Sequence, residues 1–200
     1  MYHRAAFAEP DLDRIAGLIA DHPFGLLVTA AGGLDASPVP FTVARAGAGL
    51  VLEGHLAAGN PQCVRIAPGD AALCVFGGPH AYISPSWYRT QPAVPTWDYA
   101  AVHVHGALEP VTDDAEMRAM LRRLSAHDPH FTMDQLPADF MAGMMRGIRA
   151  FRIRSQRIEA QWKMTQNRSV ADRRGVVDML RAQGSDDVAA LIEATLPETA

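Results

Sequence analysis

The sequence predicts a mainly β protein with added helices (α+β), built on a small antiparallel barrel. Six or more short β-rich segments occur, and turns such as Gly32-Gly33 and the run 46–49 separate some of them. Few helices of crossover length lie between these segments, which argues against a parallel α/β sheet. Helical patterns collect instead at the ends of the barrel and in the C-terminal tail.

Each strand and helix has its own local signal. Helices are expected at 10–21, from Asn60 to Ala67, at 113–126, at 137–147, at 169–184 and at 185–196. Strands are expected at 25–30, 38–45, 50–55, 72–76 and 101–110, with a last strand running from 151 toward 162. The first helix follows from apolar residues at helical spacing, and His22-Pro23 ends it. Pro38 and Pro40 each remove a ladder donor, so their strand should lie at a sheet edge or begin with a bulge.

The later elements follow from caps and periodicity. Asn60 before Pro61 is a helix start, and Ser169 and Gly184 bracket an amphipathic tail helix. The helix at 113–126 places Met117, Met120, Leu121 and Leu124 on one face. Phe151 and Ile153 alternate with arginines, which is typical of a strand with one buried face. We therefore expect one domain, with a barrel over 1–165 and a helical tail over 166–200.

Composition narrows the possible functions. The chain has 200 residues, a net charge of -4 and 48% apolar residues, so it has no overall attraction for nucleic acid or an anionic membrane. No apolar run approaches the roughly 20 residues of a membrane span, and no signal peptide is recognisable, so we expect a cytoplasmic protein. Cys63 and Cys74 have no CxxC or second pair, so both are expected to be buried thiols.

Arginines gather in the second half of the chain. Arg146, Arg149, Arg152, Arg154 and Arg157 form a run with no acid before Glu159. A solvated strand face balanced by acids elsewhere explains such a run better than a polyanion site does. Direct DNA binding therefore has little support from charge, and no helix-turn-helix or zinc module is recognisable.

The strongest functional signal is aromatic. Five of the seven tryptophans and tyrosines fall between Tyr82 and Tyr99, in a segment that also carries three prolines and several hydroxyls. So many rings with polar tips are what a wall for a flat, polar, aromatic ligand needs. We interpret this segment as a binding loop; packing in a dimer interface is the alternative, because Trp and Tyr are enriched there too.

Lys163 is the only lysine, against seventeen arginines. Its place beside Thr165, Gln166, Asn167 and Arg168 suggests donors for a phosphate or for the edge of a heterocycle, where a compact ammonium is needed. Chance survival of one lysine in a surface turn explains this residue equally well.

Two further motifs are weaker. The segment Gly54 to Pro61 runs from a strand end into a helix start, which suits an anion, although an ordinary turn explains it better. His103 and His105 share a strand face and could share a metal, but no third ligand accompanies them, so polar lining is the better interpretation. We expect no metal site, and a serine hydrolase is disfavoured because no Gly-x-Ser-x-Gly elbow is present.

Together these pieces resemble a known family. Met1-Tyr2, the segments 22–24, 54–57 with Asn60-Pro61, 78–88 and 94–99 with Val102-His103, and Gln166-Asn167-Arg168 look like the PaiB family of FMN-binding negative transcriptional regulators. The resemblance implies a split β-barrel that binds FMN and works as a homodimer, with flavin sites near the subunit interface. It implies a phosphate near His55 to Asn60 and a ring against neighbouring strands and partner-chain loops.

The resemblance and the donor pattern give one set of candidate FMN ligands and no catalytic residue. The candidates are His55, Leu56, Ala57, Asn60, Ser84, Trp87, Tyr88, Thr96, Trp97, Tyr99, Lys163, Gln166, Asn167 and Arg168. The chain departs from the family pattern at Ala58 or Gly59, where a basic residue is common, and at Asp98, where Asn is usual. A cation lost beside a phosphate costs about 1.5–3 kcal/mol. Arg65, Arg89 or Lys163 could supply that charge.

Three functions follow from these observations. The resemblance implies an FMN-binding negative regulator of transcription. Fold-level analogy offers a flavin-dependent oxidoreductase or a haem-degrading enzyme as the alternative. A dimeric barrel that binds no flavin is the third reading, in which the aromatic segment is purely structural.

Overall fold

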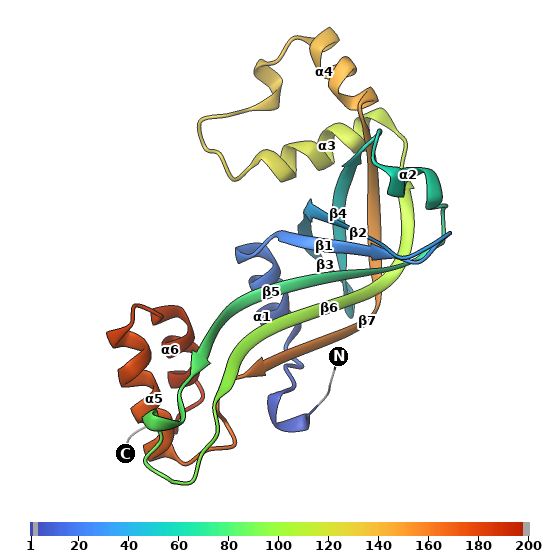
Figure 1. Ribbon diagram of the computed structural model, residues 1–200. Helices are drawn as coiled ribbons and strands as arrows, with labels where there is room; N and C mark the ends of the chain where they lie inside the picture. The colour runs from blue at the N-terminus through green and yellow to red at the C-terminus, as the bar shows by residue number, and fades with distance from the viewer. Residues whose placement is uncertain (2–3, 198–200) are drawn as a thin grey trace. The chain divides into compact units, whose positions relative to one another are not determined.

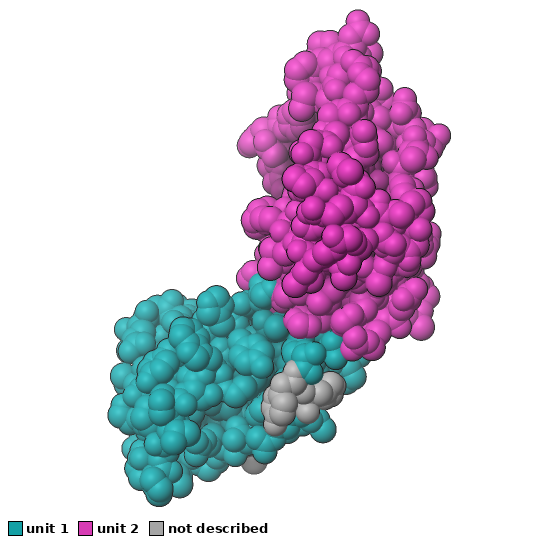
Figure 2. Space-filling model, turned by 45° about the vertical axis from the view of Figure 1, so that its right-hand side comes forward, with its two compact units in different colours: residues 1–10, 77–102, 159–200 teal, residues 11–76, 103–158 magenta. Residues whose placement is uncertain are grey.

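The structure is a computed structural model that describes residues 1 and 4–197, so Tyr2 lies outside the described residues. The chain divides into two compact units (Figure 2). The barrel unit comprises Asp11–Phe76 and His103–Ile158, and the tail unit comprises Met1–Pro10, Gly77–Val102 and Glu159–Ala200. Among the described residues, no helix is both long and apolar enough to cross a lipid bilayer.

Seven strands form one antiparallel sheet in the order β2-β1-β5-β6-β7-β4-β3 (Figure 1). They are β1 (Phe24–Thr29), β2 (Asp35–Pro40), β3 (Thr42–Ala46), β4 (Gly49–Ala57), β5 (Ala71–Ile83), β6 (Thr96–Val111) and β7 (Ile148–Lys163). The first four strands belong to the barrel unit alone, whereas β5, β6 and β7 contribute residues to both units. The predicted mainly antiparallel α+β class is confirmed.

Phe41 closes the barrel. β2 and β3 lie at opposite ends of the strand order, yet only Phe41 separates them in the chain, so the sheet must curl round to bring its edges together. The Phe41 side chain is buried and meets Phe76 and Phe151 edge to face, at 5.3 and 6.1 Å between ring centroids. These rings form the centre of the barrel core.

Helices cover the ends of the barrel and form the tail. They are α1 (Leu12–Asp21), α2 (Pro61–Arg65), α3 (Asp114–Ser125), α4 (Ala138–Arg146), α5 (Val170–Ala182) and α6 (Asp186–Glu193), with short 3-10 turns at Ala5–Phe7, Pro85–Trp87 and Met133–Gln135. Asn60 caps α2 by accepting from the Gln62 amide, and Ser169 caps α5 by accepting from the Asp172 amide. Gly184 has a φ of 76°, which ends the tail helix as predicted.

Between β6 and β7 the chain inserts α3 and α4, which lie side by side in Figure 1. Met117 and Met120 of α3 pack with Met141 and Met145 of α4 in a buried cluster. The predicted apolar face of residues 113–126 is therefore the contact face of this helical insertion.

Three local expectations are corrected. Residues 38–45 form two strands instead of one, because the amide of Phe41 leaves the ladder and donates to the Pro23 carbonyl. The segment Tyr82 to Tyr99 is only partly a loop, since β5 extends to Ile83 and β6 begins at Thr96. Apolar and polar positions alternate through both ends, so the strands continue there. Cys63 is only partly buried, whereas Cys74 is fully buried as expected.

Two arginines of the run 146–157 form ion pairs with acidic side chains. Glu53 accepts from Arg152 at 2.9 Å and from Arg123 at 2.7 Å, and Arg154 pairs with Glu109 at 3.3 Å. Pro38 lies on the edge strand β2, as its missing donor predicts. The interpretation of Arg152 and Arg154 as members of a charge-balanced strand face is confirmed.

Candidate functional site

A cavity of about 470 Å³ in the tail unit gathers half of the predicted ligands. Its walls come from the N-terminal segment, the start of β6, and the end of β7 with the turn that follows. Seven predicted ligands line it, namely Tyr88, Thr96, Trp97, Tyr99, Lys163, Asn167 and Arg168. We call it the Lys163 cavity. Its volume is in the usual range for a ligand pocket.

Lys163 holds the start of β6. Its Nζ donates to Thr96 Oγ1 at 2.6 Å and to the Trp97 carbonyl, and it pairs with Asp98 Oδ1 at 3.2 Å. An ammonium has three donors, so all three are used. These three acceptors on consecutive residues suit a compact cation better than a planar guanidinium, which explains a lysine in a chain otherwise limited to arginine. Lys163 therefore brings charge to the cavity and has no spare donor.

Asp98 is the unusual group of the cavity. It is fully buried, and its Oδ2 has no hydrogen-bond partner among the described residues. Burial raises the pKa of Asp98 to about 6, although the charge and hydrogen bond of Lys163 act in the opposite direction. Asp98 can thus exchange a proton near neutral pH.

Arg168 lies over the ring of Tyr88, with its guanidinium carbon 4.4 Å from the ring centroid. Burial raises the pKa of Tyr88, so this side chain is a neutral phenol at pH 7. Thr165 adopts a φ of 55° and turns the chain after β7, and its carbonyl accepts from the Arg168 amide at 2.9 Å. This turn is what directs Arg168 back to the cavity.

Gln166, a predicted ligand, has a structural contact instead. Its side chain accepts from the Met164 amide at 2.7 Å and donates to the Trp162 carbonyl at 2.5 Å. Ser84 likewise caps the short helix at Pro85–Trp87 and bonds to Ser86 at 2.9 Å. Neither residue lines the Lys163 cavity, nor does Trp87, which ends the short helix that Ser84 caps.

Two large rings remain exposed beside the cavity. Trp97 is 55% exposed and Tyr82 is 47% exposed, and their ring centroids lie 5.9 Å apart. His80 approaches Trp97 at 6.2 Å. Exposed aromatic side chains that contact one another in this way often mark a binding site for a ligand or a partner.

The four remaining predicted ligands of the strand-to-helix segment belong to the barrel unit. Leu56 and Ala57 pair with β7, and the amide of Ala58 donates to the Gly147 carbonyl at 2.8 Å. Asn60 uses its side-chain oxygen to cap α2 and its amide group to donate to Ser37 Oγ at 2.9 Å. Only His55 is left with unused capacity.

The Nδ1 atom of His55 is buried and has no hydrogen-bond partner among the described residues. Burial lowers the pKa of His55, so the imidazole is neutral at pH 7. No cation replaces the family's basic residue in this segment, because Arg65 is held by a two-point ion pair with Asp35. This strand-to-helix segment thus offers polar contacts to an anion and little charge.

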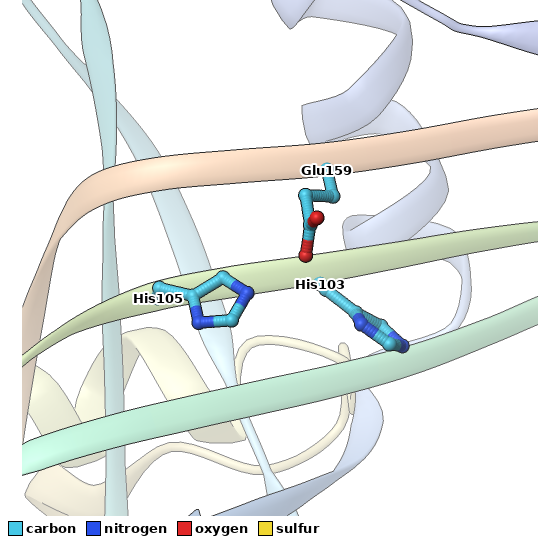
Figure 3. A group of neighbouring side chains, drawn as sticks. All are labelled: His103, His105 and Glu159. Carbon is cyan, nitrogen blue, oxygen red and sulfur yellow. The ribbon is translucent and has the colours of Figure 1, made fainter. Parts of the chain in front are cut away.

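His103 and His105 project from β6, with 6.5 Å between their ring centroids (Figure 3). Arg157 lies 3.1 Å from His105 Nδ1, and since a guanidinium can only donate, this nitrogen is an acceptor. Glu159, also labelled in Figure 3, belongs to the tail unit, whereas both histidines belong to the barrel unit. We assign no site to this group.

Half of the residues that line the cavity are not among the predicted ligands. Arg4 and Phe7 enter from the N-terminal segment, and the others are Val94, Pro95, Asp98, Gln161 and Thr165. Nothing in the local sequence joins residues 4 and 7 to Lys163, which lies more than 150 positions away. An isolated bridge between Ala8 and Gln161 brings these segments together.

Comparisons with known proteins lead to the same cofactor. Residues 1–157 match a family model described as "Putative FMN-binding domain". The chain is 31% identical over 198 residues to the protease synthase and sporulation protein PAI 2 of Bacillus subtilis (strain 168), covering 96% of this chain and 95% of that protein.

Solved structures show the fold. The flavocytochrome Anf3 from Azotobacter vinelandii matches with a TM-score of 0.65 and 12% identity, over 81% of this chain and 72% of that one. The FAD and haem binding protein from Mycobacterium smegmatis matches with a TM-score of 0.54 and 16% identity, over 78% of this chain and 72% of that one.

The curled antiparallel sheet and these neighbours define a split β-barrel fold. The chain belongs to the FMN-binding domain family, which confirms the resemblance to the PaiB family and gives FMN as the cofactor. The polar groups fit such a ligand, because the Lys163 cavity combines an exposed tryptophan, three basic side chains and a buried carboxylate oxygen with no partner among the described residues.

Proposed function

We propose that this protein binds FMN between two copies of the chain and acts as a negative regulator of gene expression. The Lys163 cavity is the observation that carries the proposal. It places cationic side chains beside exposed rings, and FMN combines an anionic phosphate with a flat polar ring. When bound, FMN supplies the redox chemistry, and the protein supplies binding and electrostatics.

In this proposal Arg168 is the principal cationic donor to FMN. Lys163 already uses its three donors, whereas the Arg168 guanidinium stacks on Tyr88 and keeps donors for a ligand. Trp97 supplies a face for the ring, and Asn167 an amide. Lys163 acts as a positioning residue by holding Thr96 to Asp98 in place and by adding charge.

The second wall comes from the strand-to-helix segment of another copy. His55 has an unused ring nitrogen there, but the segment supplies no free cation of its own, because Arg65 pairs with Asp35. A homodimer solves this deficit, because Arg168 of a second copy supplies the missing charge. Symmetry then gives two equivalent sites per dimer.

Titration of FMN against the purified apo-protein, followed by flavin fluorescence, tests the binding proposal. We expect Arg168→Gln to weaken FMN binding by about tenfold or more, as the loss of a charge-assisted hydrogen bond does. Arg154→Gln is the matched control, since Arg154 lies on β7 and pairs with Glu109 outside the Lys163 cavity. Equal affinities of the two variants would exclude Arg168 as a ligand.

Mixing two defective variants tests whether each site is shared. His55→Ala and Arg168→Gln each damage one wall, so a mixed dimer has one site with both lesions and one site with none. Random exchange should restore about a quarter of the sites, because half of the dimers are mixed. If each site lies within one chain, mixing restores nothing.

The regulatory part of the proposal rests on the similarity to PAI 2 over nearly the whole chain and on the resemblance to the PaiB family. Direct reading of DNA is not part of it, because Arg152 and Arg154 of the 146–157 run already pair with acids. Deleting the gene should raise transcript levels of its targets, and Arg168→Gln at the same locus should reproduce this effect. Unchanged transcripts in both strains would refute the regulatory role.

The alternative functions predict different results for the same purified proteins. A flavin-dependent oxidoreductase would oxidise NAD(P)H, and a haem-degrading enzyme would consume haem, at rates that Arg168→Gln reduces. A purely structural barrel would show no change in flavin fluorescence at tens of micromolar FMN. Gel-shift experiments at two salt concentrations would reveal any DNA binding directly.

A further inference from the structure

The barrel unit contains a second and larger cavity, of about 580 Å³. Its walls come from α2 and the residues after it, from the end of β6 and the start of α3, and from the end of α4 with the start of β7. None of the fourteen predicted FMN ligands lines it. This cavity, which we call the insertion cavity, is therefore lined by residues other than the proposed flavin ligands, although its β7 residues 148–150 pair with residues 55–57 of β4.

The lining of the insertion cavity is mainly apolar. Val111, Met117, Met145 and Ala150 are buried members of the cluster that joins the helical insertion to the barrel, and Phe151 extends the same surface. Methionine and aliphatic side chains adapt to irregular apolar bodies. The walls therefore suit a flexible hydrocarbon better than a flat polar ring.

Two cations stand at one side of this apolar space. Arg146 ends α4 and Arg149 follows it at the start of β7, and both line the cavity. Among the described residues, neither guanidinium has a carboxylate within ion-pair distance, unlike Arg152 and Arg154 of the same strand. Arg149 donates from Nη1 to the carbonyls of Arg146 and Ile148, which fixes the side chain and leaves its other guanidinium nitrogens available.

The remaining polar groups do not cancel this charge. Asp114 is the only carboxylate in the lining, so the charged groups sum to two cations against one anion. Burial raises the pKa of the Cys63 thiol, which is therefore neutral at pH 7. Thr112 adds a neutral hydroxyl. The cavity thus combines an apolar body with an excess of positive charge at one edge.

We propose that the insertion cavity binds an amphipathic organic acid, with an alkyl body against the methionine-rich wall and a carboxylate held by Arg146 and Arg149. Planar guanidinium groups bind carboxylates through two parallel hydrogen bonds, which gives this class of ligand its orientation. The volume admits a medium-chain fatty acid. The proposal is independent of the flavin site.

Decanoate is a suitable probe, and decan-1-ol is its neutral counterpart. We expect isothermal titration of the FMN-loaded protein to show decanoate binding at least about tenfold more tightly than decan-1-ol, because only the acid engages the arginines. FMN affinity should be unchanged in saturating decanoate. The proposal would be overturned if decanoate competed with FMN or if decan-1-ol bound equally well. It would also be overturned if no decanoate bound up to about 1 mM, a concentration that corresponds to a binding free energy of about −4 kcal/mol.

Variants separate the two ends of the ligand. Arg146→Gln/Arg149→Gln should weaken decanoate binding by about tenfold or more and leave decan-1-ol unaffected. Ala142→Phe, which fills the apolar space from α4, should weaken both probes. Arg154→Gln is the matched control and should weaken neither. If the double variant unfolds, Arg146→Gln alone can be used, because it leaves the hydrogen bond from Arg149 to the end of α4 in place. Unchanged decanoate binding in a folded arginine variant would refute the site.

Discussion

At the scale of single residues, two buried acids have opposite electrostatic settings. Asp98 has one nearby cation and an unpartnered oxygen, so burial dominates and its pKa rises. Glu53 is also buried, and burial again disfavours its charge, but Arg123 and Arg152 together outweigh this effect and lower its pKa. The number of cationic partners therefore decides whether the pKa of each buried acid rises or falls. Stability should therefore respond to pH differently through each residue.

Asp98 should make the folded protein less stable as the pH rises. Its folded pKa of about 6 exceeds the ordinary value of 3.8, so the folded state binds the proton more tightly, and the free energy of unfolding falls between about pH 4 and pH 6. Asp98→Asn should remove a decline of about 1–3 kcal/mol over this window. Urea unfolding at pH 4, 5.5 and 7 measures it. Parallel pH profiles for the parent and the variant would contradict the assignment.

Glu53 should act in the opposite direction. Its contribution is fully present above its ordinary pKa of 4.5 and is lost as the pH falls through the lowered folded value. Glu53→Gln should cost about 2 kcal/mol at pH 7, less than a fully buried pair because Arg123 is half exposed. The cost should shrink toward acid pH in the same urea series. Glu109→Gln, in an exposed pair with Arg154, is the control and should cost under about 1 kcal/mol.

At the scale of elements, the loop after β5 is fastened to the tail helix α5. The Thr90 amide donates to Asp172 Oδ1 at 2.8 Å. Gly175 of α5 faces the Trp87 carbonyl so closely that a Cβ atom there would lie 2.6 Å from the oxygen. The residues between Ser84 and Pro95 are therefore positioned by a helix that begins about 80 positions later in the chain.

This close approach gives a matched pair of glycine substitutions. Gly17→Ala in α1 meets nothing within 4 Å and should raise the free energy of unfolding by about 0.5–1 kcal/mol, the usual helix preference for alanine. Gly175→Ala should instead lower it by about 1–3 kcal/mol, because the backbone of Trp87 must move. Chemical unfolding of both variants measures the difference. A stabilising Gly175→Ala would mean that the loop is not docked on α5.

At the scale of the whole molecule, the proposed shared site links FMN binding to dimer formation. Thermodynamic linkage requires that a ligand bound only by the dimer also tightens the dimer. Saturating FMN should therefore move the dissociation of the dimer to a lower protein concentration, by about tenfold or more for a ligand at ten times its Kd.

Sedimentation velocity over a dilution series, with and without FMN, measures this shift. Arg168→Gln at the same FMN concentration should show little or none of it. A monomer that binds FMN with the full affinity of the parent protein would contradict the shared site while leaving FMN binding itself intact.

Local sequence was sufficient for most elements. Proline and glycine punctuation, capping residues and apolar periodicity predicted the α-helices α3 to α6, because these signals act within one or two turns of the chain. They failed at Phe41 and at Tyr82 to Tyr99. At Phe41 the closure of the barrel interrupts residues 38–45, which by local pattern form one strand. In the aromatic segment the many rings suggested a loop, whereas both of its ends alternate buried and exposed residues and continue as strands.

Residue types alone indicated a flat, polar, aromatic ligand, and the resemblance to a known family named it as FMN without coordinates. The tertiary structure decided which of these groups are still free to bind. There, all three donors of Lys163 are occupied, and the side chains of Gln166 and Asn60 accept hydrogen bonds from backbone amides. The fold also brings Arg4 to the same cavity. Hydrogen-bond saturation depends on contacts between distant segments, and for that reason local sequence could not predict it.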